Sequence, residues 1–256
     1  MSDTPVSQPP PPAGPPLSTA PPGALPPPAS AAGPGAAGWS PRDVVLGIVM
    51  LLAIAFVGGI IVFAIAGDSG LDATIGAQLV LEAGFLGSAV YFARRHHGTR
   101  GGLLALGLDA PRRPWAGATA LAFFGYLAFA LVYTQLVAQP EQTNVAEDLG
   151  FDSSTAGAIS AAILIVLLAP LAEETFFRGF VFGGLRGAMP SAAAIAISGA
   201  IFGSVHLTTG NVASAVQLAV LGAILAWLYE HTGSIRPTIL VHVINNGIAF
   251  AVLVGG

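Results

Sequence analysis

Ionisable side chains are rare in this sequence, and the few that fall inside long apolar stretches are the candidates for chemistry. They are Glu82, Glu173, Glu174, Arg178, His206 and His242, with Asn245 and Asn246 as polar neighbours. Such groups are costly to place in lipid, so each is a functional candidate by default. Carboxylates and imidazoles are also the side chains that most often move protons in catalysis.

Glu173 and Glu174 are adjacent, so on a helix their side chains diverge by about 100° and cannot share one direction. Glu174 and Arg178 have i, i+4 spacing in the favourable acid-first order, and we expect them to form an ion pair. Glu173 then has no local partner, and a partly desolvated carboxylate suits a general base. The alternative is that all three residues form one structural charge cluster.

Two further i, i+4 pairs follow, Phe202 with His206 and His242 with Asn246. A lone histidine in a membrane helix is usually a helix–helix hydrogen-bonding residue, but two of them near a Glu-Glu-Arg cluster favour one polar site. At 1.5 Å per residue, the depth from the Arg-marked helix ends is roughly 20 Å for Glu173, 24 Å for His206, 15 Å for Asn246 and 9 Å for His242. We therefore expect a shared cavity in which His242 is the poorest fit.

The elements that must position these residues are membrane-spanning helices. Hydrophobic residues make up 54% of the 256 residues and charged residues only 9%, against about 25% charged in a soluble domain. Seven apolar runs are long enough to cross a bilayer; they are residues 44–66, 74–92, 115–137, 155–179, 190–207, 212–229 and 237–253. The expected fold is an all-α, polytopic transmembrane helix bundle of about seven spans, with six and eight as alternatives.

Composition also divides the chain and excludes several functions. Fourteen of the twenty prolines lie in residues 1–41, which predicts a disordered Pro/Ala/Gly-rich tail before a transmembrane domain at 42–256. The net charge of −4 without any lysine argues against nucleic-acid binding. The absence of cysteine excludes disulfides, thiolate zinc sites and a cysteine nucleophile.

Arginine predicts the orientation in the membrane. Eight of the nine basic residues fall before span one or in the loops on that side: Arg42, Arg94, Arg95, Arg100, Arg112, Arg113, Arg186 and Arg236. The opposite loops contain only acids: Asp68, Asp72, Glu141, Glu147, Asp148 and Asp152. We expect a multi-pass integral membrane protein of the bacterial cell membrane, with a cytoplasmic N-terminus.

The sequence motifs of known intramembrane hydrolases narrow the possible classes of enzyme. No aspartate falls inside an apolar run, which excludes an aspartyl protease, and neither H-E-x-x-H nor a rhomboid-like G-x-S-G occurs. The ordered motifs E-E-x-x-x-R at 173–178, F-x-x-x-H at 202–206 and H-x-x-x-N at 242–246 resemble the CPBP (Abi) family. That family comprises CAAX prenyl proteases of the Ras-converting-enzyme type and bacteriocin-processing or immunity proteins. The resemblance covers about residues 155–250.

The resemblance implies an intramembrane endopeptidase acting on a peptide or protein substrate reached from the lipid bilayer. Glu173 and His206 would activate a water, His242 and Asn246 would stabilise the oxyanion, and Glu174, Arg178 and Phe202 would support the site. No cofactor is required; zinc on Glu173, His206 and His242 is an alternative that we do not favour, since a carboxylate bound to zinc is not free as base. Two different functions would also suit these residues: a catalytically idle scaffold or immunity protein on the same fold, and a proton-coupled transporter.

Residues outside the motifs have structural interpretations. Gly179, Gly183 and Gly187, and Gly199 with Gly203, would let helices approach closely. Glu82 either touches the cavity or, as we prefer, finds a polar partner such as Tyr126 or Tyr133 in the third span.

Overall fold

The computed structural model describes residues 37–66, 71–138, 155–208 and 211–255, and every regular element in these ranges is a helix. Helices α1 (Pro41–Ala66), α2 (Leu71–Ala105) and α3 (Ala116–Leu136) form the first half. A continuous helix follows, composed of α5 (Thr155–Ala162), η3 (Ile163–Leu168), α6 (Ala169–Glu174), η4 (Thr175–Phe182) and α7 (Gly183–Arg186). The last stretches are α8 (Ser191–Val205) with the short turn η5 (His206–Thr208), α9 (Val212–Thr232) and α10 (Arg236–Gly255).

These helical stretches coincide with the seven predicted runs, so the prediction of a membrane helix bundle is confirmed. Five of them, α1, α2, α3, α5–α7 and α9, are long and apolar enough to cross a membrane. Helix α8 is shorter because it ends at Val205, and α10 carries His and Asn in its middle. The protein is an integral membrane protein.

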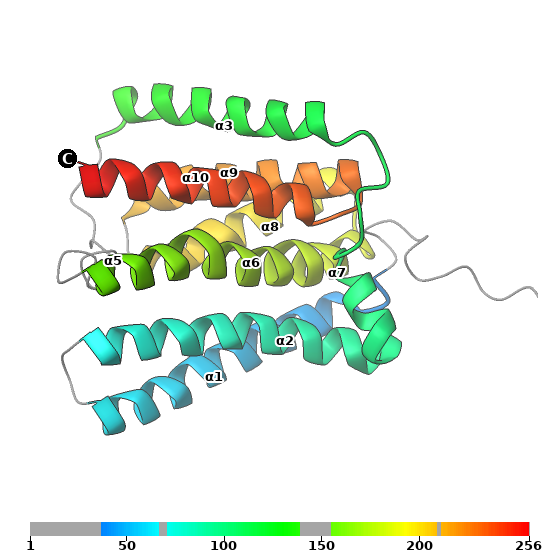
Figure 1. The fold of residues 1–256 in the computed structure, drawn as a ribbon. Coiled ribbons are helices and arrows are strands. Elements are labelled where there is room, and N and C mark those ends of the chain that lie inside the picture. The colour runs from blue at the N-terminus through cyan, green and yellow to red at the C-terminus, as the bar shows by residue number, and fades with distance from the viewer. Residues whose placement is uncertain (1–36, 67–70, 139–154, 209–210, 256) are drawn as a thin grey trace, which may run out of the picture.

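The long α5–α7 helix lies between the other elements of the bundle (Figure 1). Helices α1 and α2 flank it on one side, α8, α9 and α10 on the other, and α3 lies at the far edge. Its residues from Glu174 to Leu185 are all buried, and they include five of the largest fully buried side chains: Phe176, Phe177, Arg178, Phe180 and Phe182. The motif that carries the two glutamates is therefore at the centre of the fold.

The Arg-bearing helix ends gather at one end of the bundle (right in Figure 1). Arg236 Nε donates to the carbonyl of Leu108 at 2.8 Å, and Arg186 pairs with Glu230 at 2.9 Å. The structure thus places the arginines together, as their distribution in the loops predicts. The acidic residues expected opposite them, Asp68 and the 141–152 group, lie outside the described residues, and of Asp72 only the backbone is described.

Packing against the bundle is already present at Ala37, five residues before the expected start of the transmembrane domain at residue 42. Trp39 is 4% exposed, and its indole Nε1 donates to the carbonyl of Phe180 at 2.8 Å. His97 contacts the carbonyl of Ala37 at 2.6 Å and packs against the Trp39 ring. The expected disorder of residues 1–36 lies outside the described ranges.

Glycines bring α8 and α9 into backbone contact, as their spacing predicts. A Cβ at Gly199 would lie 2.7 Å from the carbonyl oxygen of Ala219, and one at Gly203 would lie 2.3 Å from that of Ala215. This close approach sets the position of Phe202, which lies between the two glycines and points toward the site.

Candidate active site

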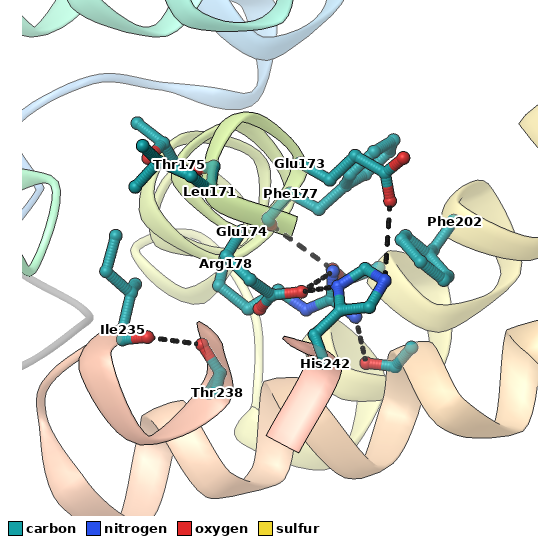
Figure 2. Close-up of polar contacts among 12 residues, drawn as sticks. Leu171, Glu173, Glu174, Thr175, Phe177, Arg178, Phe202, Ile235, Thr238 and His242 are labelled. Carbon is teal, nitrogen blue, oxygen red and sulfur yellow. Dashed lines mark hydrogen bonds and ion pairs between the residues drawn. The ribbon is translucent and has the colours of Figure 1, made fainter. Parts of the chain in front are cut away.

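The centre of the site is a buried network of Glu174, Arg178 and His242. Glu174 Oε1 lies 2.9 Å from Arg178 Nη1 with both side chains fully buried, so the predicted i, i+4 ion pair is present. His242 Nδ1 is 2.8 Å from the same carboxylate oxygen. Figure 2 shows the imidazole on α10 reaching across to the two charged side chains of the long helix. Because one carboxylate serves both partners, none of these charges is buried alone.

This hydrogen bond fixes the orientation of the His242 ring. A carboxylate paired with an arginine is an acceptor, so Nδ1 carries the proton and donates to it. The other ring nitrogen, Nε2, then faces Glu173, with 3.8 Å between Nε2 and Glu173 Oε2 (Figure 2). In the neutral ring Nε2 is an acceptor; it donates only in the doubly protonated ring.

Glu173 differs from its neighbour in both partner and exposure. Its side chain is 13% exposed, whereas that of Glu174 is fully buried. Its Oε2 atom accepts no hydrogen bond within the described part of the chain. Glu173 is thus a carboxylate that remains available at the edge of the Glu174–Arg178–His242 network, which is the division that the sequence predicts.

His206 lies beside the same network through Phe202. The Phe202 ring is 5.8 Å from the His242 ring, 4.8 Å from the His206 ring and 4.4 Å from the Arg178 guanidinium. His206 Nδ1 is 2.8 Å from the carbonyl of Phe202, which can only accept, so Nε2 of the neutral ring is left as an acceptor. Phe202 therefore joins both histidines to the arginine.

The expectation that His242 is the poorest fit is wrong, because His242 makes the closest contacts with both glutamates. The depth argument assumed that the helix ends are level. Instead, the linker between α9 and α10 returns along the bundle, so α10 begins further inside than α9 ends (Figure 1). Six residues into α10 are then enough to reach the level of Glu174.

Asn246 has a contact that sequence reasoning did not predict. The backbone of η3 bonds five residues back, as in Ala169 N–H to the carbonyl of Leu164. Pro170, the next residue, has no N–H to give to Ile165. The side-chain amide of Asn246 donates to that carbonyl at 3.0 Å instead. Asn246 thus anchors α10 to the long helix, and one of its two amide hydrogens is engaged.

Glu82 is a residue whose place was not predicted. It is 2% exposed, and Gln78 on the same helix donates to it at 2.6 Å. The expected partners lie elsewhere, since Tyr133 donates to the carbonyl of Ala213 and Tyr126 interacts with Gln217. Glu82 instead lies close enough to Glu173 for the two carboxylates to repel each other when both are charged. Its position inside an apolar run was the signal that could have placed it near the glutamate pair.

The described residues contain no group of three His, Cys, Asp or Glu side chains arranged to hold a metal. Glu174 is committed to Arg178 and His242, and the ion pairs of the described ranges join Glu173 to His242 rather than to His206. These donors do not fit a zinc site, so no step of the chemistry below passes through a metal.

A helical membrane bundle with carboxylates and imidazoles meeting at its centre is the arrangement expected of an intramembrane hydrolase. Residues 155–248 match the family model of the Rce1-like type II CAAX prenyl endopeptidases. This core of the chain is similar to that family, which is one of membrane proteases. No curated protein and no solved structure matches the chain.

Proposed function

We propose that the protein cleaves a membrane-anchored peptide beside a prenylated cysteine, using a water activated by Glu173. The observation that carries this proposal is the difference between the two glutamates. Glu174 is fully buried and bound by Arg178 and His242, whereas Glu173 is partly exposed and faces His242 at 3.8 Å. A carboxylate that is not held by an arginine, at the edge of a dry, ordered network, is a suitable general base.

In the proposed reaction, Glu173 removes a proton from the water while the water oxygen attacks the carbon of the peptide carbonyl. His206, whose Nε2 is available, assists in holding the water. When the C–N bond breaks, the proton passes from Glu173 to the leaving amine, so a carboxylate and an amine are the products. The network behind Glu173 keeps the base and the imidazole in place throughout.

The developing oxyanion is stabilised by His242 and by the amide hydrogen of Asn246 that is not bound to Ile165. His242 donates from Nε2 only as the doubly protonated ring, and the carboxylates of Glu173 and Glu174 lie on either side of that ring. A charged donor stabilises an oxyanion more strongly than a neutral one. The hydrogen bonds of His242 thus support a more specific role than the sequence pattern did.

Two adjacent substitutions test the division of labour. Glu173→Gln is expected to lower cleavage of a farnesylated CAAX peptide by about 100-fold or more, with little change in the thermal unfolding midpoint. Glu174→Gln is expected to destabilise the protein by about 3–5 kcal/mol, because it leaves the buried Arg178 charge uncompensated. Cleavage is measured by mass spectrometry, and unfolding is measured in the same detergent.

The same peptide without its prenyl group, and an unrelated transmembrane peptide, are the substrate controls. Equal cleavage of all three would contradict the proposed substrate class but leave the mechanism standing. Full activity of Glu173→Gln together with an inactive but stable Glu174→Gln would refute the assignment of the base.

A further inference from the structure

A surface groove runs between α1 and α2, away from the glutamate site. At the arginine end of the bundle it has a volume of about 690 Å³ and is lined by Met50, Gly87, Val90, Tyr91, Arg94 and Arg95. From Met50 it continues into a second hollow of about 450 Å³, which is lined entirely by apolar residues, Val57, Val80 and Ala83 among them. Both hollows lie in helices that are long and apolar enough to span the membrane.

Glycine positions explain why the groove is open here. A Cβ at Gly58 would lie 2.3 Å from Val80 and one at Gly84 would lie 2.9 Å from Leu51, so α1 and α2 are in close contact at these points. At Gly87, one turn nearer the arginine end, a Cβ would meet no atom of the described residues within 4 Å. Gly87 therefore faces open space between two points of contact, because α1 and α2 meet again where His96 Nε2 lies 3.6 Å from Asp43 Oδ2.

The groove lies on the face of α2 opposite the protein core. Phe85, Ala89 and Phe92 point inward, and Phe85 packs against Phe176 and Phe177. The groove residues follow at Gly87, Tyr91 and Arg94 on the outer face, at the spacing of a helical stripe. The groove is therefore a separate site and does not depend on the proposed function.

Two arginines at the head of the groove carry charge that no acid in the described residues neutralises. Arg94 and Arg95 are exposed, and the described ion pairs of arginine involve Arg178 and Arg186 only. Arg94 donates to the Thr99 hydroxyl at 3.3 Å, which leaves its charge uncompensated. The nearby acid, Asp43, is already bound by Ser40 and approached by His96.

We propose that this groove binds an anionic phospholipid. Guanidinium groups bind phosphate oxygens in a bidentate manner. Arg94 and Arg95 follow the apolar run of α2 and lie shortly before the kink of this helix at Gly98, at the level expected for the lipid headgroups. Arg94 and Arg95 hold the phosphate, and an acyl chain lies along Met50, Val57 and Val80 toward the bilayer centre. Two uncompensated positive charges select a headgroup with net negative charge over a zwitterionic one.

The test measures which lipids remain bound to the purified full chain. The protein is exchanged into detergent with equal amounts of phosphatidylglycerol and phosphatidylcholine of matched chains, and retained lipid is counted by native mass spectrometry. The wild type is expected to retain phosphatidylglycerol with about thirtyfold preference, since each arginine near an anionic headgroup contributes about fivefold. The double variant Arg94→Gln/Arg95→Gln should retain both lipids equally.

A second variant tests the open space of the groove independently of the arginine charges. Gly87→Leu places a side chain in open space and should abolish retention of both lipids, while leaving the unfolding temperature unchanged without added lipid. The matched controls are Gly125→Leu, another helical position whose Cβ meets no described atom within 4 Å, and Arg100→Gln, an exposed arginine outside the groove. Both should behave as wild type.

Unchanged phosphatidylglycerol preference in the double arginine variant would overturn the proposal, as would unchanged retention in Gly87→Leu. Equal loss in the Arg100→Gln control would show general charge attraction rather than a site and would overturn it too. Because the arginines are exposed, the double variant is expected to fold, and its unfolding temperature is measured alongside.

Discussion

The side chain of Asn246 supplies a hydrogen-bond donor that the backbone lacks at Pro170. Its amide donates to the carbonyl of Ile165, to which Pro170 has no N–H to offer. The same residue is proposed to touch the oxyanion through its other amide hydrogen. Stability and turnover therefore depend on different hydrogens of one side chain, and they can be separated by experiment.

Asn246→Ala should lower the free energy of unfolding by about 1–2 kcal/mol, because a carbonyl is left without a donor. In a Pro170→Ala background the cost should shrink, since the substitution restores a backbone N–H at that position. Thermal unfolding in detergent is measured for the wild type, the two single variants and the double variant, which together form a double-mutant cycle. Asn245→Ala is the control. An equal cost in both backgrounds would show that the contact with Ile165 contributes nothing. Turnover should stay low in both Asn246→Ala variants.

Residue-level prediction from sequence worked where the interaction is local. Glu174 and Arg178 are one helical turn apart, so their ion pair follows from helix geometry alone. The contacts of His242 depend on where α10 begins relative to the long helix, and no local pattern contains that information. The polar partner of Glu82, by contrast, is local: Gln78 lies one helical turn before it, so the i, i+4 spacing contained this contact and it was overlooked.

At the scale of the helices, the packing of α8 against α9 determines where Phe202 and His206 lie. Gly199 and Gly203 let the two backbones touch, and Phe202 lies between them. The seven helical runs could be predicted from hydrophobicity, and so could this close packing from the glycine spacing. The pairing of α8 with α9 rather than another helix could not, because small residues occur on most of these helices.

Gly203→Ala should destabilise the bundle by about 1–3 kcal/mol, because its new methyl group would overlap the backbone of α9 and force overpacking. The resulting shift of α8 should also move His206 and lower turnover. Gly125→Ala on α3, which has open space at its Cβ, is the control and should change neither property. Unfolding temperature and peptide cleavage are measured on both. A fully stable and active Gly203→Ala would contradict the described packing.

At the scale of the whole molecule, the clustering of arginines at one end predicts its orientation in the membrane. The end that holds Arg94, Arg95 and Arg100 should face the cytoplasm. Thr99→Cys and Ala146→Cys, each in this cysteine-free chain, can be treated with a membrane-impermeant thiol reagent on intact cells. Labelling is expected at position 146 and not at 99. The opposite pattern would reverse the orientation.

The contact of Trp39 with Phe180 has a consequence for how the protein can be truncated or fused at its N-terminal side. The carbonyl that receives the indole hydrogen bond belongs to the helix that carries Glu173 and Glu174, three residues after Phe177. A chain that starts at Ala37 keeps the hydrogen bond between Trp39 and Phe180, whereas a chain that starts at Pro41 loses it. Removal of residues 1–36 should therefore leave the unfolding temperature unchanged, and removal of residues 1–40 should lower it. A rigid fusion joined directly at Trp39 would act on the helix that carries Glu173 and Glu174 through this hydrogen bond, so a fusion partner should be joined before Ala37.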